Sequence, residues 1–340
     1  MSTVDDNTGG SGDMISNKKE CTSCEQQNDT DAIADDFNSM SILGDMSICA
    51  SCGKESNSDS MNTCNKCKMV KYCNAACKKK HRTKHKKQCE RRVAELHEEA
   101  LFKQPPPRKD CPICFLSMPS LPTGSKYNSC CGKVICNGCI YAMKMSEGKD
   151  LCPFCRSPAA NMGKEIVERV KKRVEINDPE AIFCLGLGYL KGQFGCLNGF
   201  NQDRVKALEL YHRAGELGHA EAYYNIAGLY ISGDGVGVDR KKAIHYWELA
   251  AMLGHSDARS YLGIVEANDS NWDRALKHWM IGAEGGSSAS LKSIKQLLMR
   301  GKVTKDDYTK ALRARQAYLD EIKSFQRDEA VAFNDVCKYY

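Results

Sequence analysis

Residues 49–89 read CASCGKESNSDSMNTCNKCKMVKYCNAACKKKHRTKHKKQC, and this stretch decides how the first part of the chain folds. Its metal-ligand residues fall into four close pairs: Cys49/Cys52, Cys64/Cys67, Cys73/Cys77 and His85/Cys89. A segment of about 45 residues buries too little apolar surface to fold by itself. Bound zinc supplies the missing stability, at about 10–16 kcal/mol per structural site in finger peptides.

Residues 111–155 form a second block of the same kind. Its cysteines also make four close pairs: Cys111/Cys114, Cys130/Cys131, Cys136/Cys139 and Cys152/Cys155. Two such pairs arise by chance in a cysteine-rich chain, but eight consecutive pairs in two compact blocks do not. Because a structural zinc ion takes four Cys or His ligands, the sixteen residues predict four zinc ions, two in each block.

The use of cysteine along the chain favours metal binding over disulfides. Of the 20 cysteines, 17 precede residue 156. Residues 1–13 contain no apolar stretch behind a positive charge, so we expect no secretory signal, and no run of 18 apolar residues predicts a membrane span. Thiols stay reduced inside the cell, where paired cysteines indicate metal ligands. Disulfides are the alternative for a secreted chain, and nucleus and cytoplasm both remain open.

An acidic, polar segment begins the chain. Residues 1–46 hold ten acidic side chains and two lysines, and this composition predicts a disordered tail. Cys21 and Cys24 form a solitary pair within it. We expect these two thiols to be unliganded, because no second pair lies nearby to complete a four-ligand site.

A basic run overlaps the first cysteine block. Residues 66–92 hold twelve Lys or Arg side chains against the single acid Glu90. Such a run can attract nucleic acid, or it can offset the charge of about −2 that four thiolates leave on a zinc centre. No aromatic stacking platform is interleaved with the lysines, so we do not expect nucleic acid as a partner.

From residue 179 the sequence repeats pairs of helices. The first helix of the pair recurs as EAIFCLGLGY (180–189), EAYYNIAGLY (221–230), ARSYLGIVEA (258–267) and, more weakly, ASLKSIKQLL (289–298). The second recurs as KALELY (206–211), KAIHYW (242–247) and RALKHW (274–279). Offsets of 41, 36 and about 31 residues match the period of helical solenoids.

Residues 179–330 therefore resemble the SEL-like repeat family, a relative of the tetratricopeptide repeats. The pattern Ala-x-x-x-Leu-Gly-x-x-Tyr and the pattern Lys-Ala-x-x-x-Tyr carry the resemblance. It implies a protein-binding scaffold, and a solenoid does bury its core between repeats while presenting a long concave face. We expect protein partners to bind there.

Shorter signals predict how these parts are joined. Residues 91–102 form a charged helical stretch, and the three prolines at 105–107 favour a stiff polyproline II spacer, with docking into a partner's aromatic groove as the alternative. Apolar spacing predicts a connecting helix over 163–176. The pair Thr304-x-x-Asp307 predicts a capping box that opens one long helix, which continues to about Ala330.

The first cysteine block resembles the MYND-type zinc finger, through the ending Tyr72-Cys73-x3-Cys77-x7-His85-x3-Cys89. The resemblance implies one ion on Cys49, Cys52, Cys73 and Cys77, and a second on Cys64, Cys67, His85 and Cys89.

Three positions in that block qualify the resemblance. His81 is a competing ligand, because it lies one helical turn from both Cys77 and His85. Lys78 and Arg82 stand where MYND fingers that hold proline-rich peptides carry Gln and Trp. The resemblance therefore implies the finger fold, and these two departures leave that peptide-binding mode open.

The second block resembles a RING finger along its whole length, through Cys-Pro-x-Cys at both ends and Cys-Gly-x-x-Ile-Cys-x-x-Cys in the middle. The resemblance implies a cross-brace, with one ion on Cys111, Cys114, Cys136 and Cys139 and the other on Cys130, Cys131, Cys152 and Cys155. In the commonest RING pattern a histidine ligand would follow Cys131-Gly132. Lys133 stands at that position, and it cannot serve as a neutral ligand near pH 7. The adjacent Cys130 and Cys131 restore eight ligands, and a degenerate second site is the alternative.

RING fingers bind a charged ubiquitin-conjugating enzyme, so the resemblance implies ubiquitin ligase activity. It places Ile113 and Pro153 in the apolar contact with that enzyme and Arg156 at the basic position that bridges enzyme and ubiquitin. The alternatives are local packing for Ile113 and solvation for Arg156. Closed four-ligand sites leave no position for water, and no H-E-x-x-H helix is present, so a zinc hydrolase is not expected.

The sequence thus predicts two small zinc-stabilised fingers, MYND-like and RING-like, followed by an all-α helical-repeat solenoid. The expected parts are a tail (1–46), a MYND-type finger (47–92), a linker (93–109), a RING-type finger (110–158), a connecting helix (159–178), SEL-like repeats (179–330) and a C-terminal tail (331–340). We expect a RING-type ubiquitin ligase whose solenoid binds substrates or other protein partners. The alternative is a non-enzymatic interaction scaffold.

Overall fold

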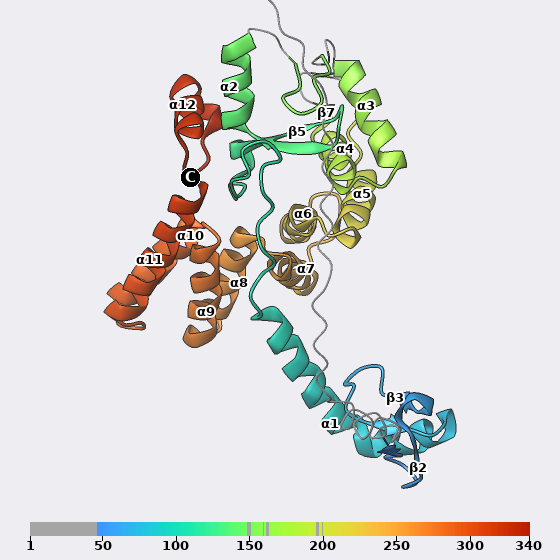
Figure 1. Ribbon diagram of the computed structural model, residues 1–340. Coiled ribbons are helices and arrows are strands. Elements are labelled where there is room, and N and C mark those ends of the chain that lie inside the picture. The colour runs from blue at the N-terminus through green and yellow to red at the C-terminus, as the bar shows by residue number, and fades with distance from the viewer. Residues whose placement is uncertain (1–45, 148–150, 159, 161–162, 195–196, 199) are drawn as a thin grey trace, which may run out of the picture. The chain divides into compact units, whose positions relative to one another are not determined.

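The computed structural model describes residues 46–147, 151–158, 160, 163–194, 197–198 and 200–340 (Figure 1). The predicted acidic tail lies outside these residues except for Met46, as do Cys21 and Cys24. The chain divides into two compact units, one ending at Cys89 and the other beginning at Glu90.

The first unit is built from short antiparallel hairpins and the start of a helix. Its elements are β1 (Met46–Ile48), β2 (Glu55–Asn57), the 3-10 turn η1 (Ser58–Ser60), β3 (Asn62–Thr63), β4 (Lys71–Tyr72) and α1 (Ala75–Leu101). Strand β1 pairs with β2, and β3 pairs with β4. The Asn74 side chain accepts a hydrogen bond from the Cys77 backbone at 2.8 Å and so caps the start of α1. The charged stretch predicted at 91–102 is the second half of this same helix.

The second unit begins with the rest of α1 and the second cysteine block. That block contains the turn η2 (Pro122–Gly124), the hairpin β5 (Ser125–Asn128) with β6 (Lys133–Cys136), and α2 (Asn137–Glu147). The core cluster of this block consists of Ile135 and four of the cysteines, a small core for a segment of this length. The helix α3 (Gly163–Glu175) follows, where apolar spacing predicts the connecting helix, and Val167 and Val170 are its buried residues.

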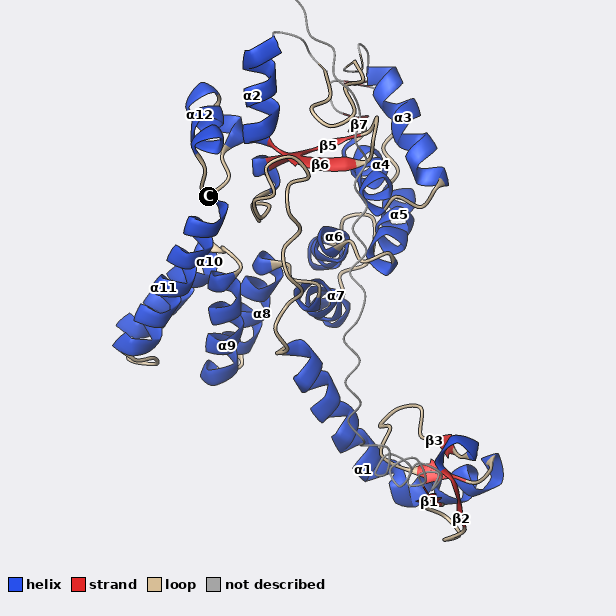
Figure 2. Ribbon diagram, in the orientation of Figure 1, coloured by secondary structure: helices blue, strands red, loops and turns tan. Residues whose placement is uncertain are grey.

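Antiparallel helix pairs form the rest of the second unit (Figure 2). The helices are α4 (Pro179–Lys191), α5 (Arg204–Glu216), α6 (Ala220–Ser232), α7 (Arg240–Met252), α8 (Ser256–Asn268), α9 (Trp272–Glu284), α10 (Ser288–Met299), α11 (Lys305–Ile322) and α12 (Phe325–Phe333). A small hairpin of β7 (Gln193–Phe194) and β8 (Leu197–Asn198) follows α4, and the turn η3 (Asp335–Cys337) follows α12. This order confirms the predicted fold class, cysteine-rich finger modules followed by an all-α repeat solenoid.

The helix boundaries of the repeats have local causes. The side chains of Asp203 and Asp239 accept hydrogen bonds from the backbone N–H groups of Lys206 and Lys242. They therefore cap the starts of α5 and α7. Helix α6 is capped at its C-terminal end by Gly233. The φ of this residue, 74°, is the left-handed conformation that glycine adopts without strain.

Small residues let the paired helices approach closely. Ala207, Ala243 and Ala275, at equivalent positions of α5, α7 and α9, are fully buried. In α8, a Cβ atom on Gly263 would lie 2.4 Å from Nε1 of Trp279, so the indole of α9 needs a glycine at this position. The same indole nitrogen donates to the Ser260 carbonyl at 3.1 Å.

Neighbouring repeats are also joined by paired histidine and glutamate side chains. His219, which precedes α6, lies 3.1 Å from the carboxylate of Glu180 in α4. His255, which precedes α8, lies 2.8 Å from the carboxylate of Glu221 in α6. These pairs have no local signature in the sequence, because Glu180 and His219 are far apart along the chain.

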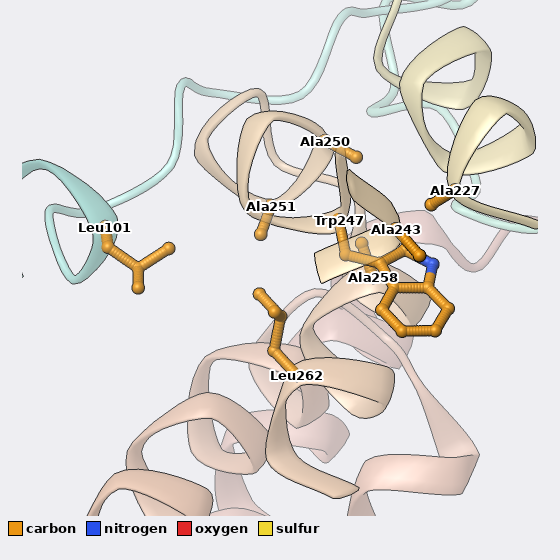
Figure 3. Close-up of a cluster of buried hydrophobic side chains, with 8 residues drawn as sticks. All are labelled: Leu101, Ala227, Ala243, Trp247, Ala250, Ala251, Ala258 and Leu262. Atoms are coloured by element: carbon orange, nitrogen blue, oxygen red, sulfur yellow. The ribbon is translucent and has the colours of Figure 1, made fainter. Parts of the chain in front are cut away.

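The end of α1 is packed into the solenoid core. Leu101 is 1% exposed and belongs to a cluster with residues of α6, α7 and α8, and Figure 3 shows its side chain pointing from α1 toward α7. The next residue, Phe102, lies 4.6 Å from the ring of His278 in α9, with the guanidinium of Arg274 5.2 Å from its centroid. Glu98 pairs with Arg274, which adds a charged contact.

The proline segment, predicted to be a stiff polyproline II spacer, continues along this contact and lies against the solenoid. Pro105 and Pro106 lie against the turn at Gly254, and Arg108 pairs with Glu321 and covers the Tyr318 ring of α11. The prolines line a cleft of about 380 Å³ between the linker, the second cysteine block and the solenoid.

The predicted single helix from Thr304 to about Ala330 is wrong. The Thr304–Asp307 capping box is present, but α11 ends at Ile322 and α12 starts afresh at Phe325. Lys323 takes an extended conformation, and the Ser324 side chain accepts a hydrogen bond from the Arg327 backbone and caps α12.

Within the described residues, no helix is long and apolar enough to cross a membrane.

Candidate metal centres

The same backbone turn occurs at four of the Cys-x-x-Cys pairs among the candidate ligands. At Cys49 the backbone N–H of Gly53 donates to the Cys49 carbonyl at 2.9 Å, and equivalent bonds link Lys68 to Cys64, Phe115 to Cys111 and Arg156 to Cys152. The residue after the second cysteine has a positive φ in all four turns: Gly53 75°, Lys68 59°, Phe115 56° and Arg156 62°.

Three of those four residues have side chains, and a positive φ is unfavourable for them. The repeated strain needs a shared cause. The turn directs backbone N–H groups and both sulfur atoms toward one point, which is what a chelating cysteine pair requires. The backbone geometry therefore fits metal coordination at every one of these pairs.

The first group brings together residues from three parts of the first unit. Cys49 and Cys52 come from the turn after β1, Cys73 follows β4, and Cys77 lies in the first turn of α1. Their sulfur atoms lie within 4.8 Å of one another. Cys73 precedes the helix, so its spacing from Cys77 arises from the capped turn at Asn74 and not from one helical face.

The second group gathers Cys64 and Cys67 with His85 and Cys89, which lie on one face of α1. All four are buried. The Nε2 atom of His85 lies 3.2 Å from the Cys67 sulfur. His81, the competing candidate, lies outside the group, and its Nδ1 atom contacts the Tyr72 hydroxyl at 3.3 Å.

The second cysteine block forms the two groups that a cross-brace requires. Cys111 and Cys114 join Cys136 and Cys139, which lie at the end of β6 and in α2. The pairs are interleaved along the chain, because Cys130 and Cys131 belong to the other group.

That other group unites Cys130 and Cys131 with Cys152 and Cys155. The two adjacent cysteines lie in the tight turn between β5 and β6, and the positive φ of this turn, 71°, falls on Gly132. Both sulfur atoms reach the group without a positive φ at either cysteine. The adjacent pair is thus placed for a complete set of four ligands.

The spacing of the sulfur atoms supports coordination rather than disulfide bonding. Representative separations are 3.7 Å for Cys52–Cys73, 3.8 Å for Cys64–Cys89, 3.8 Å for Cys114–Cys136 and 3.7 Å for Cys131–Cys152. A disulfide would bring two sulfurs to about 2.0 Å. Zinc–sulfur bonds of about 2.3 Å in a tetrahedron place neighbouring sulfurs roughly 3.8 Å apart. The clusters are therefore compatible with zinc.

The electrostatics of the first two groups point the same way. The Cys73 backbone amide lowers the pKa of Cys49 to about 6, whereas the hydrogen bond with Cys77 raises the pKa of Cys73 to about 12. In the second group, burial opposes ionisation of Cys64, but backbone amides led by that of Cys67 lower its pKa to about 6. Burial and the neighbouring Cys64 sulfur raise the pKa of Cys89 to about 11.

In both groups of the second block, one cysteine again has a lowered pKa and another a raised pKa. Hydrogen bonds from neighbouring cysteines lower the pKa of Cys111, and those same contacts raise the pKa of Cys139. The Ser157 hydroxyl lowers the pKa of Cys155 to about 6, and burial raises the pKa of Cys131 to about 11. One thiolate in a group makes the next one unfavourable, so four thiolates need a cation among them.

The residues predicted to contact a conjugating enzyme lie on the two outer turns of the second block. Ile113, two residues after Cys111, and Pro153, directly after Cys152, are half-buried, while Arg156 is exposed. Ile113 packs partly against the cysteine core. Arg156 has its own interactions within the protein.

Two exposed aromatic residues on the same turns were not found from the sequence. Phe115 is 76% exposed at the positive-φ position, and Phe154 is 45% exposed with Lys133 5.6 Å from its ring. The signal available in the sequence was an aromatic residue beside each Cys-Pro-x-Cys pair, where solvent-exposed turns are expected.

Family comparisons identify two kinds of module in this chain. The MYND finger family matches residues 49–89, and the Sel1 repeat family matches residues 179–219 and 220–255. The chain thus contains a MYND finger and Sel1 repeats, as the spacing of ligands and of helices predicted.

Individual relatives cover short parts of the chain. A stretch of 53 residues is 42% identical to "E3 ubiquitin-protein ligase GW2" of Oryza sativa, and 52 residues are 44% identical to "E3 ubiquitin-protein ligase DA2" of Arabidopsis thaliana. Each match covers 15% of this chain and 12% of the relative. The chain therefore spans only a small part of the length of these curated relatives.

Similar solved structures include a Sel1 repeat protein from Oxalobacter formigenes, with 22% identity and a TM-score of 0.40 over 54% of this chain and 71% of that one. A protective antigen from uropathogenic Escherichia coli strains has 23% identity and a TM-score of 0.37 over 50% of this chain and 40% of that one.

Proposed function

We propose that this protein is a zinc-binding ubiquitin ligase whose second cysteine block, residues 110–158, is a RING-type finger. The observation that carries the proposal is the interleaved grouping of its eight cysteines, in which the first pair shares a site with the third and the second shares one with the fourth. The ligase names of the plant relatives support it, since the match has the length of one such finger.

The proposed division of the chain follows from these modules. The MYND finger (47–92) and the RING-type finger each hold two zinc ions, on the sixteen ligands named above, and the linker (93–109) joins them. After the connecting helix (159–178), the SEL-like repeats (179–330) bind substrates or other protein partners. Residues 1–46 are the proposed acidic tail, and residues 331–340, predicted as a second tail, include the end of α12 and the buried Tyr339.

Each zinc ion would have a structural role. Four protein ligands fill its coordination, so it supplies cross-links between distant segments and leaves no position for substrate. The proposed chemistry is carried out by the bound conjugating enzyme. This chain contributes Ile113 and Pro153 as an apolar contact and Arg156 as a charge beside the carried ubiquitin. Phe115 and Phe154 extend the same exposed surface.

Ubiquitin transfer with a panel of conjugating enzymes tests this proposal. We expect the wild type to build ubiquitin chains on itself with at least one enzyme. Ile113→Ala and Arg156→Ala should each lower the rate about tenfold or more, because interface residues of this kind contribute roughly 1–2 kcal/mol or more to binding. Single-turnover discharge of the charged enzyme provides the measurement.

Matched controls are available on the solenoid. Ile264→Ala in α8 and Arg313→Ala in α11 remove the same side chains from exposed positions far along the chain, and should leave the rate within twofold. Full activity in the Ile113→Ala and Arg156→Ala variants would remove the assigned roles. Silence of the wild type across a broad panel would instead favour the non-enzymatic scaffold.

A further inference from the structure

Arg327, in the first turn of α12, is a buried cation next to the second cysteine block. It is 1% exposed. Its Nη1 atom donates to the carbonyl oxygens of Ser117 at 2.9 Å and Ile322 at 2.6 Å. Its Nη2 atom donates to the Leu116 carbonyl at 3.4 Å and to the Cys114 sulfur at 3.8 Å. Nε has no hydrogen-bond partner among the described residues.

None of these acceptors is a carboxylate, and this leaves the charge of Arg327 to be balanced. Burying a guanidinium without a negative partner is costly, so buried charges are paired or lie beside metal centres. Three of its acceptors are neutral carbonyls. The fourth is the sulfur of Cys114, one of the four cysteines that meet at the Cys111 group.

The charge of a loaded centre matches what Arg327 lacks. Four thiolates around one Zn²⁺ carry a net charge of about −2. A guanidinium that donates to one of those sulfurs would offset part of this charge, as residues around a metal's ligands commonly do. An uncharged thiol would leave the cation uncompensated.

The surrounding structure is built to hold the guanidinium in place. A Cβ atom on Gly138 of α2 would lie 2.8 Å from both Cγ and the backbone nitrogen of Arg327, so the absence of a side chain at Gly138 admits α12. Further along, the ring of Phe333 lies 5.4 Å from that of Tyr141 in α2. Tyr339 is buried after η3, and the Thr123 hydroxyl donates to the Lys338 carbonyl at 2.6 Å.

We propose that Arg327 is an outer positioning residue of the metal centre formed by Cys111, Cys114, Cys136 and Cys139. The last helix of the solenoid half thereby belongs functionally to the second finger. It supplies a cation that stabilises the metal thiolates, and metal bound there in turn holds α12 against α2. Loading of this one centre and docking of α12 are therefore linked. This inference rests on the proposed zinc binding.

Metal release from the full-length protein tests the role of Arg327. The zinc-loaded chain is challenged with a chelator, and the freed thiols are alkylated and located by peptide mass spectrometry. In Arg327→Met, we expect the cysteines of the Cys111 group to become reactive about 10–100-fold faster than in the wild type, the range found for changes around metal ligands. The other three groups in the same molecule serve as internal controls.

Two further variants separate charge from packing. Arg327→Lys keeps the cation without the planar fork, and should hold the release rate within a few-fold of the wild type. Phe333→Ala weakens the contact between α12 and α2 but keeps Arg327, so it should speed release clearly less than Arg327→Met does. Equal, fast release in all three variants would mean that Arg327 acts through packing alone. Release at the wild-type rate in Arg327→Met would overturn the inference.

Hydrogen exchange in the wild type gives a readout that does not depend on any variant folding. Partial chelation that empties the Cys111 group should reduce protection in α12 (325–333) and leave α10 (288–299) unchanged. Unchanged protection of α12 would contradict the linkage. A wild-type protein that binds no zinc would instead remove the proposed function itself, so the two failures are distinguishable.

Discussion

Replacing Cys64 with serine in the full-length chain should unfold residues 46–89 as a unit. Among the described residues, the buried core cluster of this unit consists of four ligand cysteines and two other side chains, Met61 and Tyr72. Loss of one structural zinc site removes about 10–16 kcal/mol. A folded domain has a net stability of only about 5–15 kcal/mol, so a unit with almost no core cannot absorb that loss.

Hydrogen exchange of β1 to β4 and of the first turns of α1 provides the measurement. Cys337→Ser is the matched control, since this half-buried cysteine of η3 lies outside the four groups. It should leave the exchange of residues 46–89 unchanged. Protection in the Cys64→Ser variant equal to that of the control would show that the unit folds without its second metal site.

Replacing Leu101 with alanine should destabilise the second unit by about 2–5 kcal/mol, the range for removing a buried leucine from a well-packed core. The side chain is 1% exposed among Trp247, Ala251 and Leu262, so its loss leaves a cavity between α1, α7 and α8 (Figure 3). All three tryptophans of the chain lie in the solenoid, at 247, 272 and 279. Tryptophan fluorescence during urea unfolding therefore reports this unit alone.

Leu312→Ala in α11 makes the identical chemical change at a side chain that is 42% exposed. We expect its free energy of unfolding to change by no more than about 0.5 kcal/mol, as is usual for surface substitutions. If Leu101→Ala behaves like Leu312→Ala, then the end of α1 is not docked in the solenoid. The linker would in that case act only as the stiff spacer that its three prolines predict.

The sequence predicted most reliably what depends on local spacing. The interval between Cys64 and Cys67, or between His85 and Cys89, is set by one turn of backbone, so ligand pairs can be recognised without knowing the fold. The same holds for the capping box at Thr304, and for the repeated Lys-Ala-x-x-x-Tyr pattern that marks the second helix of a pair.

Contacts between distant segments could not be predicted in this way. Leu101 ends a charged helix and gives no local sign that it packs against α7 and α8. Arg327 lies in the polar run Gln326-Arg-Asp-Glu329 and resembles a solvated surface residue, yet it is buried against Cys114. The break before α12 had one available signal, Ser324 as a helix cap, which the continuous helical pattern around it outweighed.

The His–Glu pairs between repeats lie between these two cases. Gly218-His219 and Gly254-His255 recur at the repeat period, as do Glu180 and Glu221. Each element is visible in the sequence, but the pairing needs the stacking of one repeat on the next. An alignment of the repeats by their helix starts would have placed each histidine beside the preceding glutamate.

Native mass spectrometry of the intact chain can test how the two finger regions are stabilised. Metal-bound sulfur replaces an apolar interior in residues 46–158, so the account predicts a folded protein whose mass exceeds that of the bare chain by four zinc ions. The fifteen cysteine ligands should all be free of disulfides. A compact protein that carries fewer than four ions, or whose finger cysteines are oxidised to disulfides, would contradict it.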